Sequence, residues 1–216
     1  MWHELWIAFP ALLRGLAVTL ELSAVVIVLG STIGYLGGLS LEYGPKPLWA
    51  AVRVYVDTLR GIPVLVLLFA VFYGLPIVGI QIGAFGAGVV ALSVFAGAHM
   101  TEVVRGGIAS IPRTQGDAAK AIGLQFWERL RWVILPQAVR RILPPWVNTA
   151  VELVKGSSLV SLIGVVELLL ATQQVVGRTF IVIPTYTLAG LMYFVVNYGI
   201  SRLGALVERR YAFLSY

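Results

Sequence analysis

Between Gly61 and Thr101 the chain runs for 41 consecutive residues without a charged side chain. One transmembrane helix requires only ~20 mainly apolar residues, so this run is long enough for two crossings. Of the whole chain only 12% is charged and 59% is hydrophobic, whereas soluble domains carry about 25% charged residues. The sequence therefore predicts an all-α integral membrane protein, and its 216 residues suffice for one bundle.

The composition excludes several kinds of chemistry. The chain has no cysteine, so disulfides, thiol catalysis and cysteine metal sites are ruled out. Two histidines, His3 and His99, are too few for a metal cluster. The net charge of +6 is distributed as membrane topology requires, so nucleic acid is not expected as a partner.

Five membrane spans are expected from the apolar segments. Glycine and proline residues between 74 and 83 divide the long charge-free run into two. The expected spans cover about 15–41, 52–75, 84–104, 142–166 and 179–201. Residues 1–14, with Trp2 and Trp6, are expected to lie along the membrane interface. Residues 211–216 are expected to form a cytoplasmic tail.

The positive charges predict the orientation. If the loop 105–141 is cytoplasmic, 13 of the 16 lysines and arginines lie on the inner side, and only Arg14 and Arg178 lie on the outer side. This bias follows the positive-inside rule. It places the N-terminus outside and the C-terminus inside.

A polar segment at 115–123 interrupts the apolar pattern. Residues Asp117 to Ile122 favour a short helix, which Gly116 can begin and Gly123 can cap. Pro136 is expected to end the amphipathic piece that follows. Such a helix would lie across the end of the bundle. It could be a knob for a partner protein or an ordinary amphipathic connector, and the residues alone favour neither.

The segment Gln115–Gly123, followed by Ile134-Leu135-Pro136, resembles the EAA loop of ABC importer permeases. Other segments resemble one branch of that family, the polar amino acid permeases, in order from about residue 15 to 210. These segments are Gly15–Leu20, Asp57–Pro63, Tyr73–Pro76, Glu102–Ile108, Leu135–Ala138, Leu143–Asn148 and Leu153–Leu159.

The resemblance implies a five-helix type I importer permease domain over 15–210, with its EAA loop at about 105–141, in a bacterial cytoplasmic membrane. It implies a dimer with a second permease copy or a paralogue, a pair of ATP-binding subunits and an extracytoplasmic solute-binding protein. The ATPase-coupling residues would be Gly116, Asp117, Ala118, Ala119, Lys120, Ile122 and Gly123. The chain has no Walker-type phosphate loop. ATP and Mg are therefore expected on the ATPase subunit, with no cofactor and no enzymatic site in this chain.

Polar residues in the fourth span are the candidate substrate site. Glu152 shares a helix face with Asn148 and Thr149. It could attract a substrate ammonium or guanidinium, or it could pair with Lys155 or with an arginine of a neighbouring span. Ser158 and Ser161 could face a cavity or bond to their own backbone.

The resemblance adds two positions to this candidate site. Leu67 and His99 stand where the family commonly has glutamine and tyrosine. The expected function is import of a polar amino acid. The alternatives are another small solute of the same family, such as an opine or a modified amino acid, and an ion-coupled secondary transporter.

Overall fold

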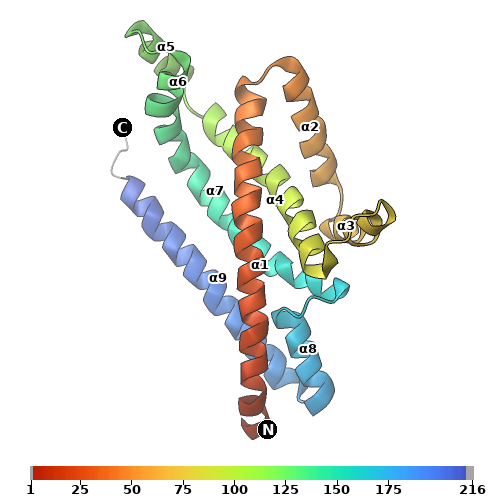
Figure 1. Cartoon of the computed structure of the whole chain (residues 1–216). Helices are drawn as coiled ribbons and strands as arrows, with labels where there is room; N and C mark the ends of the chain where they lie inside the picture. Colours follow the sequence, from red (N-terminus) through yellow and green to blue (C-terminus); the bar gives the residue numbers. More distant parts are fainter. Residues whose placement is uncertain (1, 213–216) are drawn as a thin grey trace.

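The computed structural model describes residues 2–212, with side chains from 6 to 210. Within this range every regular element is a helix, and Figure 1 shows these helices as an elongated bundle. Three helices are long and apolar enough to cross a membrane, and each of two bent helix pairs could add one more span. The elements are α1 (Trp2–Tyr43), α2 (Lys46–Gly61), α3 (Val64–Ile77), α4 (Gly83–Ala109), α5 (Arg113–Ala121), α6 (Phe126–Arg129), a π-helical turn (Leu130–Ile134), α7 (Leu135–Gly156), a 3₁₀ helix (Ser157–Ile163), α8 (Leu168–Thr179) and α9 (Val182–Ala212).

The first helix is longer than the expected first span. It continues without a break from Trp2 to Tyr43, although Pro10 lies inside it. Residues 2–14 therefore belong to the same helix as the span, and no break marks the expected interfacial segment. Residue 1 lies outside the described residues.

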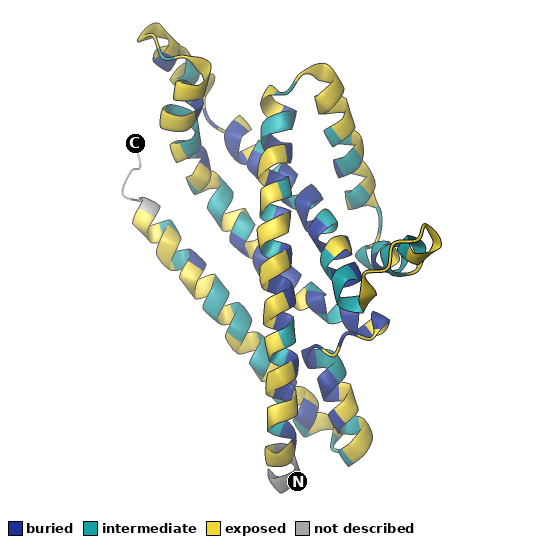
Figure 2. Ribbon diagram, viewed as in Figure 1, coloured by how far each residue is buried: buried dark blue, intermediate teal, exposed yellow. Residues whose placement is uncertain are grey.

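Helix α4 forms the centre of the bundle, and α1 lies along it (Figures 1 and 2). Glycines allow the close approach, because a Cβ on Gly30 would lie only 2.6 Å from the Cβ of Ala96. Gly34 faces Met100 and Gly38 faces Val104 in the same way. These glycines of α1 thus let it pack closely against α4 of the same chain.

The expected second span is bent instead of straight. Helices α2 and α3 meet at 106° around Ile62 and Pro63. Proline disfavours the helical conformation at the preceding residue, and Ile62 is extended, with φ −99° and ψ 132°. The expected break after this span is confirmed: α3 ends at Ile77, and Gly79 (φ +83°) and Gly83 (φ +64°) turn the chain into α4.

The fourth span also differs from the prediction. Pro136 does not end the preceding piece, because the helix continues through it into α7. The π-helical turn before it keeps the chain helical. The α-helix then ends at Gly156 and continues as the 3₁₀ helix up to Gly164, whose φ is +89°.

The last two helices were predicted only in part. Helix α8 occupies the segment that was expected to be an outer connection. The fifth span is confirmed as α9, which extends to Ala212, so the expected tail shrinks to 213–216, outside the described residues. Only 6% of the apolar window of α9 is buried within the chain. Its exposed apolar surface must therefore meet lipid or another protein.

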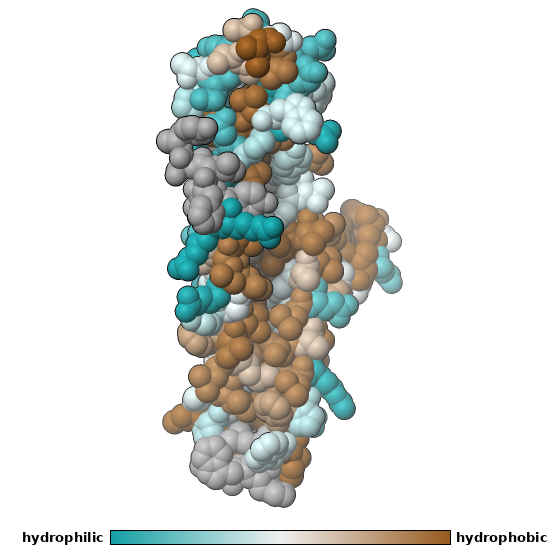
Figure 3. All heavy atoms as spheres, turned by 90° about the vertical axis from the view of Figure 1, so that its left-hand side faces the viewer, coloured by the Kyte–Doolittle hydropathy of each residue, from teal (hydrophilic) through white to brown (hydrophobic). Residues whose placement is uncertain are grey.

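Polar and apolar side chains are separated along the length of the molecule. Apolar residues cover most of the face drawn in Figure 3, and hydrophilic residues are numerous at the end that carries α5. The N-terminus lies at the opposite end, whereas the C-terminal end of α9 points towards α5 (Figure 1). The chain therefore crosses from one end of the bundle to the other.

Candidate functional site

Helix α5 is a short, well-defined helix at one end of the bundle. It begins after Pro112, three residues before the expected start at Gly116, and ends at Ala121. Gly123 has a left-handed φ of +88°. The Gly123 N–H donates to the Lys120 carbonyl at 3.0 Å, and the Leu124 N–H donates to the Ala119 carbonyl at 3.1 Å. This pair of bonds is a Schellman cap, so the predicted role of Gly123 is confirmed.

Most of the outer surface of α5 is exposed. It projects beyond the ends of α1 and α4 (Figure 1). Ala119 is buried, whereas Asp117, Ala118 and Lys120 are exposed. The side chain of Ile122 is 78% exposed. A capped helix with an exposed apolar tip is suited to insertion into a partner.

The loop that carries α5 is fixed to the bundle on both sides. The Arg141 guanidinium donates to the Ser110 carbonyl at 2.8 Å, where α4 leads into α5. The Tyr43 and Phe126 rings lie edge to face, with centroids 5.3 Å apart, and join the end of α1 to α6. A displacement of α5 would therefore be transmitted to α1, α4 and α7.

Three predicted substrate residues share one cavity between α3, α4 and α7. His99, Thr149 and Glu152 line a space of about 200 Å³ together with Phe95, Val64 and Gly156. The His99 ring lies 4.4 Å from the Phe95 ring, and its Nδ1 lies 3.1 Å from the Phe95 carbonyl. The cavity thus has apolar walls with an imidazole, a hydroxyl and a carboxylate at its edge.

The carboxylate of Glu152 has no partner among the side chains that the structure describes. No side chain between residues 6 and 210 forms an ion pair or a hydrogen bond with it. The predicted alternative, a pair with Lys155 or with a neighbouring arginine, is therefore wrong for the single chain. An acidic group in a membrane-spanning helix needs such a partner or water, and none of the described side chains supplies the partner.

The other predicted substrate residues lie outside this cavity. Leu67 packs against the main core cluster, and Asn148 is exposed. The Ser158 hydroxyl donates to the Lys155 carbonyl at 2.8 Å, and the Ser161 hydroxyl donates to the Ser158 carbonyl at 2.6 Å. Of the two alternatives for these serines, backbone bonding is the one observed.

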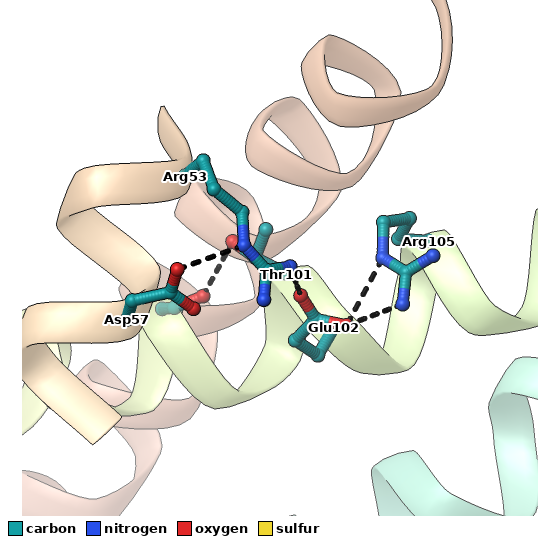
Figure 4. A network of polar contacts seen from close by, with 6 residues as sticks. Arg53, Asp57, Thr101, Glu102 and Arg105 are labelled. Carbon is teal, nitrogen blue, oxygen red and sulfur yellow. Dashed lines mark hydrogen bonds and ion pairs between the residues drawn. The ribbon is translucent and has the colours of Figure 1, made fainter. Parts of the chain in front are cut away.

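A charged network joins α2 to α4 at the α5 side of this cavity. Arg53 bonds both Asp57, at 2.9 Å, and Glu102, at 2.8 Å (Figure 4). Glu102 also pairs with Arg105 at 2.7 Å. Asp57 is paired with Arg53, one helical turn before it. The network ties the start of the bent span to the central helix.

Sequence reasoning missed a buried acidic residue, Glu167. Its side chain is completely buried at the N-terminus of α8. Its carboxylate accepts hydrogen bonds from the Leu169 and Leu170 N–H groups, both at 2.9 Å. It also accepts bonds from the hydroxyls of Tyr193, at 2.7 Å, and Thr19, at 3.3 Å. Glu167 thereby joins α1, α8 and α9.

Another groove carries no comparable chemistry. A groove of about 540 Å³ lies between the first turns of α1 and α9, and Trp6, Phe9, Ile183 and Leu188 are among its lining residues. None of its described lining side chains is ionisable, which does not suit a polar solute.

A membrane bundle with an internal carboxylate and a rigid helix exposed at one end defines a class of transport subunit. The model of one family, the binding-protein-dependent transport system inner membrane component, matches residues 30–213. The chain belongs to this family, and it is therefore the transmembrane subunit of an ABC importer, forming its translocation path. The resemblance found in the sequence is confirmed.

Known proteins agree with this assignment over nearly the whole chain. YckA of Bacillus subtilis (strain 168), a probable amino-acid ABC transporter permease protein, is 33% identical over 95% of this chain and 91% of YckA. The glutamine transport system permease protein GlnP of Escherichia coli (strain K12) is 32% identical, with 97% and 96% covered. The crystal structure of an amino acid ABC transporter with histidines matches with a TM-score of 0.90, at 31% identity, over 97% of this chain and 98% of that chain.

Proposed function

We propose that this chain carries polar amino acids across the bacterial cytoplasmic membrane. The observation that supports this most strongly is the unpaired Glu152 carboxylate beside His99 and Thr149 in an otherwise apolar cavity. A carboxylate in a membrane-spanning helix offers a partner to the ammonium group of an amino acid, or to the guanidinium of a cationic one. The names of the similar permeases, which include a glutamine permease, support the substrate class.

The cavity requires a second permease copy or a paralogue to become a closed site. Its volume of about 200 Å³ is below the ~300–1,000 Å³ that ligand pockets usually have. Glu152 itself is exposed on the single chain. A facing copy would cover this side, and it would also cover part of the apolar surface that α9 leaves open. A solute delivered by an extracytoplasmic binding protein would then pass between the two copies.

Movement of the ATP-binding subunits would be transmitted to the bundle through α5. We infer that each of two ATP-binding subunits receives one α5 helix, because the helix is capped, exposed and fixed to both α4 and α7. The ATP and Mg would be bound by those subunits, and this chain would perform no catalysis. ATP and the loaded binding protein would each favour one conformation of the bundle, and their differential binding would drive the exchange.

The proposed orientation places α5 in the cytoplasm and the N-terminus outside. Lys120 is exposed on α5, so a cysteine at this position can be labelled without disturbing the core. In the otherwise cysteine-free chain, we expect Lys120→Cys to react with a membrane-impermeant maleimide only in inside-out vesicles. Labelling in intact, right-side-out cells would contradict the proposed orientation.

Replacement of Glu152 tests the substrate site. Glu152→Gln keeps the shape of the side chain and removes its charge. If the carboxylate binds a cationic substrate, uptake of arginine or lysine should fall at least about tenfold, the equivalent of 1.4 kcal/mol, and uptake of glutamine should fall much less. The matched control is Glu42→Gln, at the exposed end of α1, which should leave uptake unchanged. An equal loss for all substrates would assign Glu152 a structural role.

A further inference from the structure

Two arginines converge on a second cavity, at the end of the molecule opposite to α5. A cleft of about 340 Å³ lies between α1 and α8. Its polar lining consists of Arg14 from α1 with Gln174 and Arg178 from α8, and its apolar lining includes Val18 and Val166. By the positive-inside count, Arg14 and Arg178 are the two basic residues assigned to the outer side. Both of them line this one cleft.

The cleft follows from the way α1 and α8 pack. Gly15 lets the helices approach closely, since a Cβ there would lie 2.7 Å from the Cβ of Ala171. The neighbouring Arg14 cannot enter so tight a contact and lies at its edge. On α8, Ala171 and Val175 are buried in the packing, whereas Gln174 and Arg178 are exposed. The close contact thus leaves the long polar side chains along one open side of the helix pair.

Neither guanidinium has a partner within the part of the chain whose side chains are described. Arg14 and Arg178 form no ion pair and no hydrogen bond there. Glu21, seven residues after Arg14 on α1, does not pair with it. The nearby Glu167 carboxylate is already occupied by Thr19, Tyr193 and the α8 backbone. Two cations that face one cleft without a counter-charge constitute an anion site.

The depth of Arg14 indicates which anion fits. The expected first span begins at about residue 15, directly after Arg14. Arg14 is therefore placed at the outer membrane interface, the level of the lipid headgroups, where an arginine finds a charge partner. The phosphate groups of phospholipids lie at this level.

We propose that this cleft binds the phosphate of a phospholipid in the outer leaflet. The planar guanidinium groups of Arg14 and Arg178 match phosphate oxygens in bidentate geometry. The Gln174 amide adds a hydrogen-bond donor, and the apolar lining lies against the first methylene groups of the acyl chains. The bound lipid supplies the missing counter-charge and holds α8 against α1. This inference does not depend on the solute, because it concerns lipid binding by the assembled permease.

Lipid titration of the purified permease assembly tests this proposal. Phosphatidylglycerol is added to delipidated assembly, and native mass spectrometry measures the affinity for the first bound lipid. We expect Arg14→Gln with Arg178→Gln to lower this affinity at least about tenfold. The matched control is Arg209→Gln with Arg210→Gln, which removes the same charge from exposed positions near the C-terminal end of α9. This control should change the lipid affinity less than twofold. Lysine at both positions should give an intermediate loss, because lysine lacks the bidentate fork.

Two further measurements distinguish a bound lipid from a free anion and from a protein partner. Inorganic phosphate at millimolar concentration should not displace the lipid, and displacement would mean that the site takes a free anion. Docking of the solute-binding protein should be unchanged in the double glutamine variant. Equal lipid affinity in this variant and the wild type would overturn the proposal. Loss of binding-protein docking with lipid binding intact would also overturn the proposal, because it would assign the arginines to a protein partner.

Discussion

Replacing Gly123 with proline is expected to remove the ATP-binding subunits from the purified assembly, while the chain still inserts into the membrane. Gly123 has a φ of +88°, whereas proline fixes φ near −65° and has no N–H group. The substitution therefore destroys the left-handed cap and the bond from Gly123 to the Lys120 carbonyl. Without its cap, α5 loses the fixed direction in which it presents Asp117 and Ala118. Co-purification with a tagged permease measures the effect.

A glycine outside the coupling residues provides the matched control. Gly106 lies near the end of α4, and no atom would lie within 4 Å of a Cβ placed there. Gly106→Ala should therefore keep the helix and retain the ATP-binding subunits. Asp117→Lys, which reverses an exposed charge without altering the fold, should lose them as Gly123→Pro does. Normal co-purification of either damaging variant would contradict the docking role of α5.

Replacing Glu167 with alanine is expected to destabilise the fold strongly. The side chain is completely buried and accepts four hydrogen bonds from three helices. Its removal leaves the Tyr193 hydroxyl and two N–H groups of α8 without acceptors inside the protein. Each buried polar group left without a partner costs about 1–3 kcal/mol. We therefore expect a loss on the order of 3 kcal/mol or more in the free energy of unfolding.

Thermal unfolding of the purified protein in detergent measures this loss. Glu167→Gln keeps one carbonyl oxygen and should give an intermediate melting temperature. Glu21→Gln, an exposed glutamate on α1, is the control and should melt like the wild type. A Glu167→Ala variant that melts within about 1 °C of the wild type would show that the three-helix junction does not stabilise the fold.

The general fold could be predicted from the sequence because it depends on local signals. The length of the apolar runs predicts the long helices, and the glycines around residue 79 predict the turn between α3 and α4. Two prolines were misjudged. Pro63 bends the second span because Ile62 must be extended before it. Pro136 does not end its helix because a π-helical turn precedes it, and hydropathy carries no information about either effect.

The candidate site was predictable only where residues lie on one helix. Thr149 and Glu152 share a face of α7, but their proximity to His99 depends on how α4 packs against that helix. The buried position of Glu167 could not be predicted for the same reason. A glutamate before an apolar run is typical of an ordinary helix start, and its partners Thr19 and Tyr193 are 148 and 26 residues away. Contacts over such sequence distances leave no periodic signal.

The docking of α5 is the claim on which the transport mechanism depends. A photo-crosslinking amino acid at position 118, which is exposed on α5, tests it in the assembled importer. On irradiation it should form one covalent product with the ATP-binding subunit, and the same probe at position 6, at the other end of α1, should form none. Crosslinks from position 118 only to lipid or to the permease itself would contradict the proposed mechanism.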